Sequence, residues 1–167
     1  MIMTDIASTT RPFAPARRLD FDGLVPAFSR AVSALDDAAV AELDRTGIDA
    51  GLRELVRLRA SQLNGCSYCV DTHTRAAHDA GEPLQRIAAV AVWAESNFFT
   101  VAERAAFALT DAVTRLSETH VPDEVVAEAR AQYSDEQVAA LLSLIVSINA
   151  WNEIGVTARC WRPRLER

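Results

Sequence analysis

The fold and the chemistry of this chain are decided by one stretch, Asn64-Gly65-Cys66-Ser67-Tyr68-Cys69-Val70-Asp71-Thr72-His73. Asn and Gly tolerate a left-handed backbone and commonly end a helix, so a new helix is expected to begin near Cys66. Positions three and four apart share one helix face, which places Cys66, Cys69 and His73 along one stripe. A dithiol beside an imidazole is the minimum equipment for reversible thiol–disulfide chemistry.

Helical signals continue on both sides of this stretch. Asp49 is suited to cap a helix that runs to about Leu63, and the helix from Cys66 is expected to reach about Ala80, where Gly81 closes it. Apolar residues recur at helical spacing over 24–43, where Asp36-Asp37 could start a second helix. Later start signals are Pro83, the capping-box pairs Thr100/Glu103 and Ser134/Gln137, and Pro122-Asp123. These signals predict helices over about 83–95, 100–117, from 122, and 135–159.

The whole pattern indicates a single all-α domain of about six to eight helices. The chain has 167 residues, half of them hydrophobic, with only six glycines and six prolines, and no segment shows sustained strand alternation. Residues 1–18 mix prolines with arginines and carry no periodic pattern. We expect them to form a loosely ordered arm, with the helical domain over 19–167.

Charge and hydropathy exclude several functional classes. The formal net charge of −6 disfavours binding to nucleic acid or to an anionic membrane surface. The longest uncharged apolar run, 138–152, is shorter than the roughly 18–20 residues of a membrane span. No secretory signal is recognisable at the start, so a soluble cytoplasmic protein is expected. Thiols are kept reduced there, and a Cys-x-x-Cys pair is then more often catalytic or metal-binding than a structural disulfide.

The cysteine pair allows three interpretations. A thiol in the first helical turn is stabilised as the thiolate, and His73 could either stabilise the Cys69 thiolate or accept its proton; the pair could then attack a peroxide or a disulfide. Alternatively, Cys66 and Cys69 could form half of a zinc site with Cys160 and His73, although zinc needs four ligands and Cys160 has no neighbouring ligand. Inert buried thiols are the third interpretation. Redox chemistry is favoured, and a thioredoxin-like fold is not, because no strand precedes the motif.

Other polar residues have ordinary interpretations. Glu54 lies among Arg53, Arg57 and Arg59, so an ion-paired surface face is the default expectation for it. Cys160 is expected to be a buried or half-buried thiol. Four further titratable side chains are expected at the surface; these are His78, His120, Asp71 and Asp79.

The spacing Glu54, eleven residues, Cys66-x-x-Cys69, three residues, His73 resembles the motif of the AhpD-like alkylhydroperoxidases of the carboxymuconolactone decarboxylase superfamily. The surrounding segments are also similar to the family's sequences; these are 57–66, Ala80-Gly81-Glu82 and 148–152. The resemblance therefore covers roughly residues 24–161. It implies an AhpD-like helical fold with the redox pair at a helix N-terminus. It also implies a peroxiredoxin-type antioxidant oxidoreductase without metal or organic cofactor, assembled as a homotrimer or homohexamer.

The resemblance further implies a role for each site residue. Cys69 would be the peroxidatic nucleophile and Cys66 the resolving thiol; Glu54 would be the base that starts a proton relay, which His73 passes on. The substrate would be an alkyl or organic hydroperoxide, and the reductant an external dithiol on a lipoyl-bearing or thioredoxin-like protein. Tyr68 departs from the histidine that peroxidase members carry between the cysteines, which bears on peroxidase strength. Lactone decarboxylation is not expected, because decarboxylase members generally lack the dithiol.

Two further hypotheses accompany the peroxidase. The pair could serve a protein disulfide reductase, or a non-catalytic redox sensor in which Cys66–Cys69 oxidation alters assembly. Large rings are numerous for a small helical chain, which favours burial of some of them in a subunit interface; these are Trp93, Phe98, Phe99, Trp151 and Trp161.

Overall fold

The computed structural model describes residues 13–163 of the chain, and within that range it is all-helical. The described residues form nine α-helices and one 3-10 helix, without a strand. In chain order the helices are α1 Phe21–Leu24, α2 Pro26–Thr46, α3 Ala50–Asn64, α4 Ser67–Asp79, α5 Leu84–Ala89, the 3-10 helix η2 Val90–Glu95, α6 Val101–Thr114, α7 Leu116–Thr119, α8 Asp123–Gln132 and α9 Asp135–Ala158. The all-α prediction is confirmed; the expected six to eight helices fell short because α1 and α7 are single turns of four residues.

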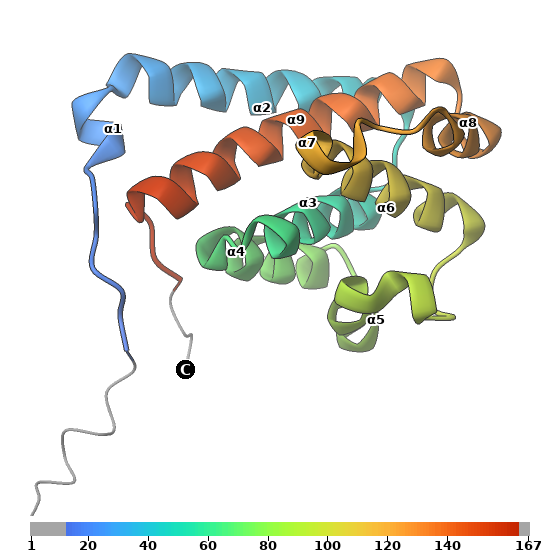
Figure 1. The fold of residues 1–167 in the computed structure, drawn as a ribbon, viewed down its shortest axis with the longest axis horizontal. Helices are drawn as coiled ribbons and strands as arrows, with labels where there is room; N and C mark the ends of the chain where they lie inside the picture. Colours follow the sequence, from blue (N-terminus) through green and yellow to red (C-terminus); the bar gives the residue numbers. More distant parts are fainter. Residues whose placement is uncertain (1–12, 164–167) are drawn as a thin grey trace, which may run out of the picture.

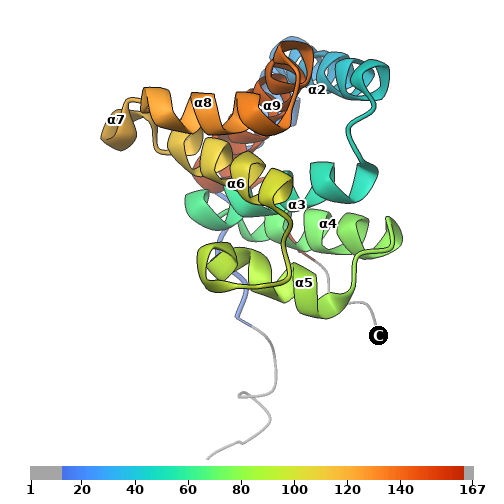
Figure 2. The same cartoon turned by 90° about the vertical axis from the view of Figure 1, so that its right-hand side faces the viewer.

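The long helix α9 lies at the centre of the packing. It packs on α2, α3, α6 and α4, and in Figure 1 its N-terminal part lies beside α2 while its C-terminal end diverges from that helix. Seen from the side in Figure 2, α2 and α9 lie above α3 and α4, and α5 lies lowest. Leu141, Leu144, Ile145 and Ile148 of α9 are fully or almost fully buried. This arrangement places the N-terminal half of α4 next to the C-terminal half of α9.

The apolar character of α9 comes from this central position. At 24 residues it is the single described helix that is long and apolar enough to cross a membrane by length and composition. The uncharged apolar run 138–152 lies within this helix, whose bounds agree with the helix expected over 135–159. Its buried face supplies the main core, in which Leu43, Leu55 and Phe107 pack against it or one another without solvent exposure.

Most helix boundaries follow the local signals. The Asp49 side chain accepts a hydrogen bond from the Leu52 N–H, capping α3. Gly65 ends α3 with a φ of 68°. Glycine adopts this left-handed conformation without steric strain because it has no Cβ. Both capping boxes are formed, at Thr100 with Glu103 and at Ser134 with Gln137.

Three boundaries differ from the prediction. Asp36-Asp37 does not start a new helix, because α2 runs unbroken through it. The helix expected over 83–95 is α-helical only to Ala89 and continues as η2, in which Val92 leaves helical backbone angles. Arginines of other helices bond the η2 carbonyl groups: Arg59 donates to Ala91 O, and Arg104 to Trp93 O and Ala94 O. The helix expected over 100–117 ends at Thr114 and resumes as α7.

The two described ends of the chain meet beside α9. The backbone N–H groups of Arg18 and Leu19 both donate to Ala158 O, at 2.9 and 3.0 Å, and the two terminal segments run down the same side of the molecule in Figure 1. Of the arm expected over 1–18, residues 1–12 lie outside the described range; residues 13–18 are exposed and form no helix.

Candidate active site

The cysteine pair occupies the junction between α3 and α4. Gly65 turns the chain, and the Cys66 N–H donates to Ser61 O at 3.0 Å. Cys66 is the N-cap of α4, and its Sγ accepts the Cys69 N–H at 3.3 Å. The two sulfurs are joined in a disulfide, and the residues are only 2% and 4% exposed. The pair is therefore held at a helix N-terminus, where backbone N–H groups favour thiolate over thiol.

An ion-paired histidine lies one turn further along α4. His73 Nδ1 is 2.8 Å from Glu54 Oε2 on α3, and both side chains are largely buried. The second Glu54 oxygen accepts from Arg57 at 2.7 Å. Burial alone would raise the pKa of Glu54, but the hydrogen bond from His73 and the charge of Arg57 outweigh it and hold that pKa below its ordinary value. Glu54 is thus a carboxylate, and His73 donates through Nδ1.

This tautomer of His73 leaves the second ring nitrogen, Nε2, able to accept a proton. A carboxylate cannot donate, so the Nδ1 proton belongs to His73, and a neutral ring then carries its lone pair on Nε2. Nε2 has no hydrogen-bond partner among the described residues, and His73 lines the same cavity as Cys69. His73 can therefore accept a proton in that cavity and return it, while the carboxylate stabilises the imidazolium in between.

The carboxylate is itself anchored by a chain of charges that the sequence did not reveal. Arg57, only 8% exposed, bonds Asp36 on α2 at 3.1 Å as well as Glu54. Asp36 in turn accepts from Ser147 Oγ on α9 at 2.7 Å. The surface position expected for Glu54 is wrong, because its side chain is only 15% exposed. Of the three arginines expected to pair with it, Arg57 does so, whereas Arg53 pairs with Asp44 and Arg59 with Asp111. Arg57 and Asp36 form contacts 21 residues apart, so no local pattern pointed to them.

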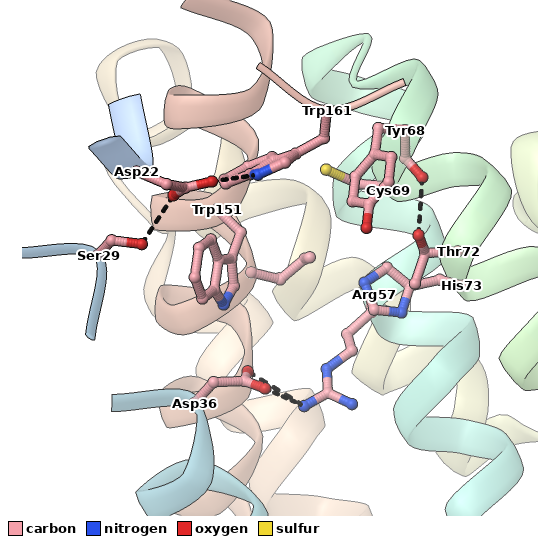
Figure 3. Close-up of a pocket in the computed structure, with 11 residues that line it drawn as sticks. Asp22, Ser29, Asp36, Arg57, Tyr68, Cys69, Thr72, His73, Trp151 and Trp161 are labelled. Atoms are coloured by element: carbon pink, nitrogen blue, oxygen red, sulfur yellow. Dashed lines mark hydrogen bonds and ion pairs between the residues drawn. The ribbon is translucent and has the colours of Figure 1, made fainter. Parts of the chain in front are cut away.

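A cavity of about 400 Å³ opens over Cys69. Figure 3 shows Trp161 at the top of the cavity, Trp151 on one side, Tyr68, Cys69 and His73 on the other side, and Arg57 below them. The Trp161 ring centre is 5.7 Å from Tyr68 and 5.4 Å from Trp151, and its Nε1 donates to Asp22 at 2.8 Å. The cavity therefore combines an aromatic wall with the sulfur and the imidazole. The sequence marked Trp151 and Trp161 as core or interface residues and missed their place here.

Buried amides fix the end of α3 to α9. Asn64 Nδ2 donates to Asn149 Oδ1 at 2.7 Å and to Asn152 Oδ1 at 3.0 Å. Asn152, which is fully buried, donates to Ser61 Oγ at 3.1 Å. Because Asn64 directly precedes the Gly65-Cys66 turn, these bonds set the position of the disulfide against α9.

The other sequence candidates lie apart from this cluster. His78, His120 and Asp79 are exposed, and Asp71 pairs with Arg75 on α4. Cys160 is a half-buried free thiol, and burial together with the charge of Asp22 raises its pKa. Within residues 13–163, His, Cys, Asp and Glu side chains form no group of three that could hold a metal ion. Cys160 and His73 are thus not gathered with the cysteine pair into a ligand set.

Comparison with known proteins gives one family and several relatives. The model of the carboxymuconolactone decarboxylase family matches residues 26–112. The uncharacterised protein YdfG of Bacillus subtilis (strain 168) is 38% identical over 112 residues, covering 67% of this chain and 76% of YdfG. A protein of unknown function from Agrobacterium tumefaciens, described by its crystallographers as a candidate antioxidant defence protein AhpD, is 35% identical with a TM-score of 0.83, covering 90% of this chain and all of that one.

A more distant structural likeness extends to the debrominase Bmp8. Its variant in complex with 2,3,4-tribromopyrrole is 22% identical to this chain, with a TM-score of 0.72 over 85% of this chain and 73% of that one. At that identity the likeness concerns the fold alone.

Proposed function

The chain belongs to the carboxymuconolactone decarboxylase family, and from this premise we propose that it is a thiol-dependent hydroperoxide reductase of the AhpD-like type. The observation that carries the proposal is the cavity that Cys69 and His73 share, with His73 held by the Glu54 carboxylate. The likeness to the Agrobacterium protein over the whole of that chain supports the same class of chemistry.

The proposed reaction starts from the reduced pair. His73 Nε2 takes the Cys69 proton, and the Cys69 thiolate attacks the outer oxygen of ROOH, which breaks the O–O bond. The departing alkoxide takes the proton back from His73 and leaves as ROH, while Cys69 becomes a sulfenic acid. The Cys66 thiolate then attacks the Cys69 sulfur, so that hydroxide leaves, is protonated to water, and the Cys66–Cys69 disulfide forms.

Glu54 has a positioning role in this proposal. The family resemblance implied that Glu54 is the base that starts the proton relay. However, a carboxylate whose pKa is lowered by His73 and Arg57 holds a proton poorly. Its contacts instead support orientation of the His73 ring and stabilisation of the imidazolium.

The proposal is tested by titrating the thiols before and after oxidation, by peptide mapping and by a turnover assay. The reduced protein should lose two thiols per chain on addition of one equivalent of cumene hydroperoxide, form the Cys66–Cys69 disulfide in peptide maps, and cycle repeatedly with excess dithiothreitol. A single oxidation without turnover would instead favour the redox-sensor hypothesis, and turnover of protein disulfides but not of hydroperoxides would favour the disulfide reductase.

A second candidate is reductive dehalogenation of an aromatic ring, favoured by the aromatic wall of Tyr68, Trp151 and Trp161 over Cys69. The balanced reaction converts Ar–Br and two thiols into Ar–H, HBr and a disulfide. Bromide release from 2,3,4-tribromopyrrole by the reduced protein, at a rate above that of the Cys69→Ser variant, would establish it; no release would leave the hydroperoxide reaction.

We also propose that the chain self-associates, as a trimer or hexamer. Large apolar side chains of α1, α2 and α9 are exposed to solvent; these are Leu24, Phe28, Leu35, Leu142 and Val146, each more than 40% exposed. Exposed apolar side chains in this number support an interface. Light scattering at micromolar concentration should give a multiple of the chain mass, and a monomer would refute the assembly.

A further inference from the structure

The two sulfurs of the disulfide border different cavities. Cys69 lines the cavity with His73, whereas Cys66 lines a second cavity of about 260 Å³ that Cys69 does not reach. Tyr68 and Trp161 border both cavities and form the wall between them. The second cavity is lined by the turn 65–68, by the end of α9 and by the two terminal segments; its members include Pro15, Arg18, Gly155, Val156, Arg159, Arg162 and Pro163.

Gly155 leaves the Cys66 sulfur facing the second cavity. A Cβ at this position would lie 3.0 Å from Cys66 Sγ and 3.5 Å from the Trp161 ring. Because Gly155 carries no side chain, the α9 backbone approaches the sulfur closely and the space beside it stays open. The position is helical and needs no left-handed backbone, so the close approach is the physical reason for a glycine.

The charges of the two cavities are opposite. Three exposed arginines, Arg18, Arg159 and Arg162, line the Cys66 cavity, and no acidic side chain is among the described residues that border it. The Cys69 cavity contains Asp22, whose hydrogen-bond partners Trp161 and Ser29 are neutral, and Asp36, which is neutralised by Arg57. An anionic molecule is therefore attracted to the Cys66 side and repelled from the Cys69 side.

We infer that the cavity beside Cys66 is the entry site of the reductant, and that this reductant is a slender dithiol carrying negative charge. The inference deepens the proposed function and rests on it. At about 260 Å³ the cavity admits a flexible chain ending in thiols but no folded domain. The negative charge is supplied either by an acid group of a free dithiol or by acidic residues beside a dithiol borne on a carrier-protein arm.

The exchange balances through this entry. A thiolate of the reductant attacks Cys66 Sγ from the side away from Cys69, forms a mixed disulfide, and expels the Cys69 thiolate into the cavity where His73 protonates it. The second thiol of the reductant then attacks its own sulfur in the mixed disulfide and expels the Cys66 thiolate, which the Cys69 N–H stabilises. The dithiol leaves as a cyclic disulfide, and two electrons have passed to the cysteine pair. The proton of the second reductant thiol passes to Cys66, and the proton that the first thiol released to solvent replaces the one that His73 gave to Cys69. Oxidant and reductant thus approach from opposite sides of one disulfide.

The test measures reduction separately from oxidation. The disulfide is formed with diamide, so that reduction can be followed whether or not the protein reacts with hydroperoxides. Its reduction is timed by acid quench and thiol alkylation with two matched pairs of probes. Dihydrolipoate is compared with neutral dihydrolipoamide, and a dihydrolipoyl-lysine peptide rich in Asp and Glu is compared with its Gln and Asn counterpart.

The variant is Arg159→Gln/Arg162→Gln, and its matched control is Arg30→Gln/Arg115→Gln, two exposed arginines that line neither cavity. We expect at least one charged probe to react about three- to tenfold faster than its neutral match at low ionic strength, as two exposed charge interactions allow. The preference should disappear in the variant and in high salt, and persist in the control.

The probe that shows the preference identifies the source of the charge: the free acid points to a small dithiol, and the acidic peptide to a carrier arm. Equal rates for both pairs in the parent protein would overturn the inference, as would a preference that survives in Arg159→Gln/Arg162→Gln. Oxidation of the same reduced proteins by cumene hydroperoxide is measured in parallel. If that reaction fails while the charge preference holds, the proposed peroxidase is refuted and the entry site stands.

Discussion

Replacement of Glu54 by Gln tests whether the carboxylate drives the His73 relay. Glutamine has the same shape and retains one oxygen, which can accept from His73 Nδ1. The change therefore keeps the His73 contact, while it removes the charge and the bond that Arg57 donates to the second oxygen. The bond concerned is short, 2.8 Å, between side chains that are 14% and 15% exposed, which keeps solvent screening small. A hydrogen bond between charged groups contributes about 1.5 to 3 kcal/mol against about 1 for a neutral one.

If this difference of about 0.5 to 2 kcal/mol is expressed in the transition state, the oxidation rate should fall by about 2- to 30-fold. The assay is the second-order oxidation of the reduced protein by cumene hydroperoxide, followed in stopped flow through Trp151 and Trp161, which lie in the same cavity as Cys69. Glu54→Asp keeps the charge and should recover part of the rate. Glu42→Gln, which removes an exposed carboxylate paired with Arg45, is the matched control and should leave the rate unchanged.

A rate for Glu54→Gln within twofold of the parent would refute the positioning role, as would an equal loss in Glu54→Gln and Glu54→Asp. Combining Glu54→Gln with His73→Gln shows whether the loss of oxidation rate acts through His73 or is an independent effect of Glu54. Because Glu54 acts through His73, the double variant should be no slower than His73→Gln alone; fully additive losses would show that Glu54 acts independently.

Three further predictions concern the scaffold of the site. Asn152→Ala removes two buried hydrogen bonds, to Ser61 and Asn64, and should lower the free energy of urea unfolding by about 2 to 4 kcal/mol; a loss below about 0.5 kcal/mol would contradict the bridging role. Gly155→Ala should destabilise the oxidised protein by about 1 to 2 kcal/mol and the reduced protein less, because an unbonded Cys66 sulfur can rotate away; equal losses would argue against the close approach. Since the pKa of Glu54 is lowered in the fold, its contribution is complete above the ordinary value of 4.5 and lost as pH falls through the lowered one. Unfolding free energies measured against pH should therefore fall less steeply in acid for Glu54→Gln than for Glu42→Gln, and parallel curves would exclude the linkage.

The sequence predicted the parts of the fold that depend on local chemistry. Asp49, Gly65 and the Thr100 and Ser134 capping boxes act within four residues, and the structure contains all of them. The cysteine pair and His73 were placed correctly at the start of α4 for the same reason, because they lie within one and two turns of a helix end.

The prediction failed where distant side chains decide local structure. Asp36 reads as a helix start, but its carboxylate is occupied by Arg57 and Ser147, 21 and 111 residues away, and α2 continues past it. The carbonyl groups of η2 accept hydrogen bonds from Arg59 and Arg104, which lie on other helices. Neither arginine is close enough in sequence for any capping or periodicity rule to include it.

The candidate site divides in the same way. Spacing alone placed Cys66, Cys69 and His73 on one helix face, but Glu54 was joined to them only through the family resemblance, since spacing alone cannot bring α3 and α4 together. Trp161 was unpredictable as a cavity residue because its place depends on the chain folding back after α9, where its ring meets Tyr68 and its Nε1 meets Asp22.

The central claim is that Cys69, not Cys66, reacts with the hydroperoxide. The direct measurement is to treat reduced Cys66→Ser and Cys69→Ser with one equivalent of cumene hydroperoxide, trap sulfenic acid with dimedone, and locate the adduct by mass spectrometry over time. We expect rapid trapping at Cys69 in Cys66→Ser and none at Cys66 in Cys69→Ser on the same time scale. Equally rapid oxidation of Cys66 in Cys69→Ser would refute this assignment and make the helix N-cap residue the nucleophile.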